Sequence, residues 1–142
     1  MRTAAQWSVT SLMICLVISY GCQTVEHAEQ PQWVQVPIAD LSNVEGKWDG
    51  LMRRVPPERR DDWLTVTIAS NGRYQFSSLR TIGVFSGHGE FSVNEGKLQS
   101  RSERGTVEAV LYEAGSQRML KAKGRAADGT EYTAEVKPVK VR

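Results

Sequence analysis

Beyond residue 44 the chain alternates apolar or small residues with polar ones at a period of two. The clearest stretches are residues 63–68, 73–78, 120–124 and 132–137. Such alternation indicates β-strands with one buried face and one face in water. A helix needs apolar residues at spacings of three and four, and no segment after residue 44 sustains that spacing. The pattern therefore predicts an all-β domain.

Turn residues separate these stretches. Asn71-Gly72 is a strong hairpin signal because both residues tolerate positive φ. The turns predict strands at 44–52, 62–69, 73–79, 82–93, 97–102, 106–112, 117–124 and 130–140. Without crossover helices these form an antiparallel up-and-down meander. Because two open edges invite aggregation, we expect the meander to close into a small barrel of about eight strands, bent at Gly87 and Gly89.

A barrel of this size is either filled by its own side chains or just able to hold one small ligand. The bulky residues that we expect to point inward are Trp48, Tyr74, Phe76, Phe91, Leu111 and Leu120. The small ones are Gly87, Gly89, Ala109, Ala122 and Ala134. Two interiors are consistent with this set, a packed one with a shallow pocket at one mouth and a deep cavity.

The first twenty-two residues read as an export signal. Arg2 supplies a positive charge, the apolar run from Val9 to Tyr20 follows, and Gly21 precedes Cys22. The run has about twelve residues, whereas a transmembrane helix needs about 20. The segment resembles bacterial lipoprotein signals, although Ser19 stands where leucine is usual and Tyr20 is bulkier than usual.

That resemblance implies a signal peptide over residues 1–21 and acylation of Cys22, for example with palmitate. Gln23 is not the aspartate associated with inner-membrane retention, so the resemblance implies the outer membrane, facing the periplasm. The one other cysteine, Cys15, would leave with the signal peptide. The alternative is an ordinary secretory signal that is cut nearby.

Residues 22–43 are predicted to be a lipid-anchored tether, because Gln, Glu, Thr and Pro dominate them. The stretch from Trp33 to Val36 is apolar enough to add an edge strand, and a fully disordered tether is the alternative. Residues 44–142 form the predicted barrel domain.

Gly46-Lys47-Trp48 opens the first predicted strand and resembles the Gly-x-Trp signature of the calycins, the lipocalin and avidin superfamily. The resemblance implies that Trp48 closes the barrel base against an arginine from a late strand, for which Arg125 and Arg142 are the candidates. It also implies binding of a small apolar or amphipathic ligand, for which we name Trp48, Tyr74, Phe76 and Phe91. The alternative is that Trp48 is simply a core aromatic.

The segment 53–62 is expected to be a loop between the first two strands. It carries Arg53, Arg54, Arg59 and Arg60 together with three acidic residues and two prolines. One hypothesis makes it a docking site for an anionic partner, in an envelope protein that acts as an inhibitor or assembly accessory. The other is a solvated connection whose charges balance locally.

The sequence offers little for catalysis. Its two histidines, His27 and His88, have no metal-ligand spacing around them, and no Gly-x-Ser-x-Gly turn is present. The formal net charge is +2, with acidic and basic residues interspersed and no basic stripe for nucleic acid. We therefore expect a non-catalytic envelope protein that contacts a membrane through its lipid and uses no cofactor or metal.

Overall fold

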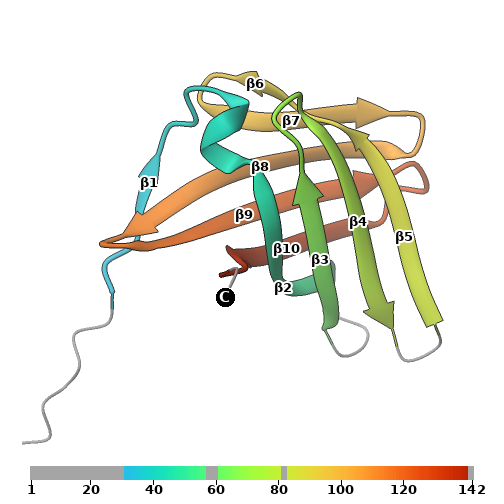
Figure 1. Ribbon diagram of the computed structural model, residues 1–142. Helices are drawn as coiled ribbons and strands as arrows, with labels where there is room; N and C mark the ends of the chain where they lie inside the picture. Colours follow the sequence, from blue (N-terminus) through green and yellow to red (C-terminus); the bar gives the residue numbers. More distant parts are fainter. Residues whose placement is uncertain (1–30, 57–60, 81–82, 141–142) are drawn as a thin grey trace, which may run out of the picture.

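The computed structural model describes residues 31–56, 61–80 and 83–140 (Figure 1). They form ten strands and one short 3-10 helix. The elements are β1 (Val34–Val36), η1 (Leu41–Val44), β2 (Gly46–Val55), β3 (Asp62–Ile68), β4 (Arg73–Arg80), β5 (Gly83–Glu90), β6 (Ser92–Asn94), β7 (Lys97–Ser102), β8 (Gly105–Ala114), β9 (Gln117–Ala126) and β10 (Glu131–Pro138). The predicted all-β antiparallel meander is confirmed. None of the helical structure in these ranges is long and apolar enough to cross a membrane.

The strands follow one another around a nearly closed barrel in the order β5-β4-β3-β2-β10-β9-β8-β7-β6. The first and last strands of this meander, β2 and β10, pair over eight residues. In Figure 1, β8, β9 and β10 cross β3, β4 and β5 at a steep angle. Within the described residues β5 and β6 share no ladder, although only Phe91 separates them. We call this opening, between β5 and the hairpin strands β6 and β7, the seam.

The interruption of the predicted strand 82–93 falls at Phe91 and not at the two glycines. Phe91 is 7% exposed, and its N–H donates to the carbonyl of Gly72 at 2.8 Å. β5 continues unbroken through Gly87 and Gly89, so the expected corner there is not observed. A Cβ on Gly87 would lie 2.6 Å from the Phe76 ring, and one on Gly89 would lie 2.5 Å from the Tyr74 hydroxyl. The glycines therefore give the aromatic rings of β4 room to lie across β5.

The segment before the barrel packs on it. Of the two alternatives for Trp33 to Val36, the structure shows the edge strand, since β1 pairs with β8 beyond the residues that β7 occupies. The backbone N–H of Ile38 donates to the Gly96 carbonyl at 2.8 Å, and the Ile38 side chain is 1% exposed. Asp40 caps η1 by accepting from the backbone N–H of Ser42 at 2.8 Å.

These contacts divide the barrel interior into two parts. At one end η1 covers the barrel, and the largest fully buried side chains include Trp48, Ile38, Ile68, Leu98 and Val44. We call this the closed end. The β7–β8 and β9–β10 turns lie at the opposite, open end, together with the end of β2 and the start of β3. Near the open end the inward positions of β8 and β9 hold small side chains, among them Gly105, Val107 and Gly124, which leaves the barrel hollow there.

Candidate functional site

A cavity of about 250 Å³ occupies the open half of the barrel, and we call it the inner cavity. It exists because the inward positions of β8 and β9 carry small residues where β4 carries rings. The small or short residues that line it are Gly105, Val107, Ala122, Gly124, Ala126 and Ala134. Period-two alternation places all of them on one face of their strands. Met52, Leu64 and Val66 complete the apolar lining.

Aromatic rings form the opposite wall. Tyr74 stacks on Phe91 with ring centroids 4.2 Å apart, and Phe76 meets Phe85 at 5.5 Å in a tilted arrangement. The Tyr74 hydroxyl lies 3.3 Å from Oγ of Ser100. Three of the four predicted ligand residues, Tyr74, Phe76 and Phe91, thus line the inner cavity. Phe85 also lines it. It lies two residues before Gly87 on β5, so alternation puts it on the inward face already expected of Gly87 and Gly89, and its register opposite Ser78 agrees.

Trp48, the fourth predicted residue, lies at the closed end and is not part of the cavity lining. It is 1% exposed, and its Nε1–H donates to the Val44 carbonyl at 2.9 Å. The guanidinium of Arg118 lies 5.8 Å from its ring centroid and also donates to the carbonyl of Asn43. Trp48 therefore seals the barrel base against a late-strand arginine and ties η1 to the barrel.

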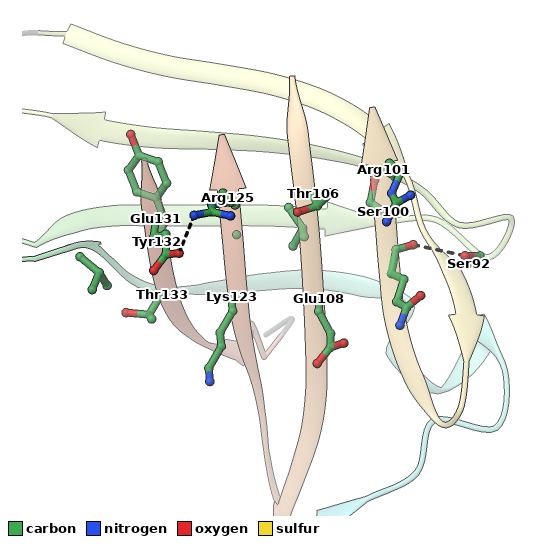
Figure 2. A pocket seen from close by; sticks show the side chains of 14 residues that line it. Ser92, Ser100, Arg101, Thr106, Glu108, Lys123, Arg125, Glu131, Tyr132 and Thr133 are labelled. Atoms are coloured by element: carbon green, nitrogen blue, oxygen red, sulfur yellow. Dashed lines mark hydrogen bonds and ion pairs between the residues drawn. The ribbon is translucent and has the colours of Figure 1, made fainter. Parts of the chain in front are cut away.

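The arginine over Trp48 is on β9, but it is neither candidate expected from the sequence. Arg125 lies on the outer face, where it pairs with Glu131 at 3.5 Å (Figure 2). Arg142 lies outside the described residues. The register of β9 against β8 and β10 puts Arg118 on the same face as Leu120, at the closed end.

Polar groups gather where the cavity meets the seam. His88 of β5 and Arg104 of the β7–β8 turn line the inner cavity and also a shallow outer groove of about 550 Å³. The groove carries Thr65, Thr67, Gln75, Ser77 and Ser86, which are hydroxyl or amide side chains. No acidic side chain is found among the described residues that line the cavity or the groove. The seam thus joins an apolar interior to an outer groove whose described lining is polar and without acidic side chains.

The arginines of the predicted loop do not form one site among the described residues. Arg53 and Arg54 lie within β2, whose ladder with β10 continues to Val55. Arg53 donates from Nε and one Nη to the carboxylate of Asp61 at 2.8 and 2.7 Å, which lowers the pKa of Asp61. Arg54 is half-buried and opposite Tyr132, on the other face of β2. Arg59 and Arg60 lie outside the described residues.

A second hollow, of about 620 Å³, lies on the outer face of β7 to β10 (Figure 2). Its charged side chains are of both signs, and they include Arg101, Glu108, Lys123, Arg125 and Glu131. Glu108 pairs with Lys97 at 3.1 Å, and Arg125 pairs with Glu131. Charges that alternate and pair in this way are typical of a solvated sheet face. We therefore take the inner cavity as the candidate site.

No group of three or more His, Cys, Asp or Glu side chains in the described ranges is placed to hold a metal ion. Cys22 and His27 lie outside these ranges. The sequence matches no protein-family model, and a comparison with curated proteins finds no relative.

Proposed function

We propose that this protein is a membrane-anchored, lipocalin-like envelope lipoprotein that binds a small apolar or amphipathic ligand and does not transform it. The observation that supports this proposal is the inner cavity, an apolar space of about 250 Å³ in a barrel whose other end Trp48 seals. Pockets for drug-sized ligands span about 300–1,000 Å³. At about 30 Å³ for a group the size of a water molecule, this cavity holds roughly eight such groups. The ligand is therefore small, such as a single short alkyl chain.

The distribution of polar groups favours an amphipathic ligand. Its apolar part fits among Phe76, Val107 and Ala122, which line the cavity. Its polar end fits at the seam, where the Arg104 guanidinium and the His88 imidazole lie beside the hydroxyl-rich groove. A polar end there keeps its hydrogen bonds with water or with these groups, so its desolvation cost stays low.

Ligand binding is tested with octanol and octanoate, which match the size of the cavity. All described strand pairings lie within residues 34–138, so the chain from Gln23 onward contains the whole barrel. Methyl resonances of Ala122 and Ala134, in the cavity wall, are expected to shift and saturate during an NMR titration. Those of Ala39 and Ala114, outside the cavity lining, serve as controls and stay in place. Equal shifts at all four methyls, or none, would contradict binding in the cavity.

The anchor is tested separately. We propose that Cys22 carries the acyl groups and that the domain faces the periplasm from the outer membrane. The full chain, grown with an alkyne-bearing fatty acid, is expected to take up the label and to fractionate with the outer membrane. Cys22→Ser is expected to abolish labelling. Labelling that persists in Cys22→Ser, or a wild-type chain that never takes up the label, would rule this anchor out.

A further inference from the structure

Four large apolar side chains form a row on the outer face of the barrel. Leu51, Trp63, Leu79 and Val84 belong to β2, β3, β4 and β5, and each lies directly opposite the next in the strand register. Their exposed fractions are 47, 50, 62 and 67%. Scattered exposed apolar residues are normal, whereas a contiguous apolar patch of a few hundred Å² is often functional. We call these four residues the apolar row.

Polar residues border the row on three sides. Toward the open end lies the Arg53–Asp61 ion pair, at 2.7 Å. Toward the closed end the next register row consists of Asp49, Thr65, Ser77 and Ser86. Beside Leu51 on β10 is Glu135, which pairs with Lys121 at 3.0 Å. The row is thus a continuous apolar band. Arg53 and Glu135 beside it are paired, and Asp49 of β2 places a carboxylate on its closed-end side.

We propose that the apolar row inserts into the surface of a lipid bilayer. Trp63 exposes about half of the roughly 150–250 Å² of an aromatic side chain, and with the smaller Leu51, Leu79 and Val84 the row presents on the order of 400 Å². A stable protein interface needs about 800 Å² from each partner. A bilayer surface requires no matching shape, and burial of apolar side chains to a depth of about 5–10 Å is enough for binding. Trp63 in the middle of the row is the residue type enriched at membrane–water interfaces.

The short segment between Cys22 and the barrel supports contact with a bilayer. Cys22, the proposed site of acylation, precedes the first described residue, Pro31, by nine positions. Even fully extended, nine residues span only about 30 Å. The barrel then stays close to the bilayer, and a weak second contact becomes an intramolecular one. Insertion of the apolar row does not depend on a ligand in the inner cavity. The membrane proposal and the ligand proposal can therefore be refuted independently.

The charges beside the apolar row predict which lipid headgroups it binds. Because Arg53 is paired with Asp61 and Glu135 with Lys121, the neighbourhood of the row has no excess of positive charge. Insertion should therefore be driven by apolar burial and not by anionic headgroups. We expect binding to vesicles of zwitterionic phosphatidylcholine, with little change between low and high salt.

The experiment uses the chain from Gln23 onward with Trp33→Phe. Trp48 is 1% exposed, so Trp63 is then the one exposed tryptophan of this chain. Phosphatidylcholine vesicles with brominated acyl chains are expected to quench its fluorescence, and the protein to co-sediment with them. Leu51→Ser, Leu79→Ser and Val84→Ser together should lower the partition coefficient at least tenfold. A matched control replaces exposed apolar residues elsewhere, Val34→Ser and Val139→Ser, and should bind as before.

Three outcomes would overturn the inference. The first is no sedimentation of the parent chain, and the second is an equal loss in the row variant and in the control. The third is a dimer in analytical ultracentrifugation that the row variant abolishes, since the row would then contact a second copy. Circular dichroism of each variant verifies that the barrel is folded, and a row variant that unfolds is replaced by Leu79→Ser alone, whose partition should still fall relative to the control.

Discussion

Adding a side chain at Gly124 should fill part of the inner cavity, weaken ligand binding and make the protein more stable. Gly124 lies on β9 and faces the cavity between Val107 of β8 and Tyr132 of β10. The nearest neighbours of a Cβ placed on it are the Thr106 carbonyl oxygen at 3.6 Å and Cγ2 of Val107 at 3.7 Å. These are ordinary van der Waals distances. The backbone there is extended, so Gly124→Val introduces no strain in φ.

The expected magnitude follows from the volume and from the strand. Three added carbons, at about 30 Å³ each, remove about a third of the 250 Å³ cavity. Glycine in a strand interior costs about 0.5–1 kcal/mol relative to alanine. Burial of further methyl groups contributes about 0.8 kcal/mol each, reduced by the lost side-chain entropy. We expect the free energy of unfolding to rise by about 1–2 kcal/mol, and Tm by about 4–8 °C.

Thermal unfolding by circular dichroism measures stability, and the octanol titration measures binding. The contrasting variant is Gly89→Val, whose Cβ would lie 2.5 Å from the Tyr74 hydroxyl and should lower Tm. If Gly124→Val lowers Tm, the space beside Gly124 is already filled. If it binds octanol as the parent chain does, the ligand lies elsewhere. Either result would refute the reasoning from the cavity.

Three further predictions concern the scaffold. Gly50→Ala should cost about 3 kcal/mol or more in urea unfolding, because its Cβ would lie 1.9 Å from the backbone oxygen of Glu135. Arg118→Leu should cost about 1–2 kcal/mol in the same assay, because it removes the cation–π contact with Trp48 and the hydrogen bond to the Asn43 carbonyl. In NMR titrations, Arg53→Gln should raise the pKa of the Asp61 carboxyl toward its ordinary value of 3.8, because the hydrogen bonds from Arg53 lower it. Any stability from that pair is present above pH 3.8 and is lost as the pH falls through the lowered pKa.

Each of these has a control. Gly115→Ala alters an exposed turn glycine with nothing within 4 Å of its Cβ, so its cost should come only from its positive φ and stay well below that of Gly50→Ala. Arg101→Leu removes an exposed arginine of β7 and should leave stability nearly unchanged. The pKa of Asp128 is lowered by hydrogen bonds that its carboxylate accepts from Thr130, so Arg53→Gln should not move it. A shift of Asp128 equal to that of Asp61 would mean that the whole open end rearranges.

The alternation of side chains and the turn residues predicted the features that depend on local backbone geometry. Alternation over 73–78 correctly placed Tyr74 and Phe76 on the inner face, because the two faces of a strand are set by residue parity. Asn71-Gly72 correctly marked a hairpin, and Gly72 has a φ of 86°. The strand 82–93 was predicted as continuous because nothing local at Phe91 breaks the alternation. The break depends on the hydrogen bond from Phe91 to Gly72 and on a buried ring, both of which are tertiary contacts.

Alternation and turn residues did not predict the contacts between segments that lie far apart in the chain. Arg118 is 70 positions from Trp48 in the chain, and only the pairing of β9 with β10 and of β10 with β2 brings the two together. The loop predicted from Arg53 onward is partly strand, because Arg53 and Arg54 pair with Thr133 and Tyr132 of β10. Charge-rich composition does not reveal such a ladder, since the strand that supplies it lies far along the chain.

What the sequence by itself determined is the strand period, most of the turns and the identity of the side chains on the inner face. These follow from backbone geometry, in which successive side chains alternate between the two faces and turns require particular residues. Only the tertiary structure decided that the barrel is packed around Trp48 and hollow beside Gly124, and that four exposed apolar residues line up across β2 to β5. Cavity volume and surface patches depend on how strands shift against one another. A shift of one pair changes which small residue faces which ring, and that relation is absent from any single strand.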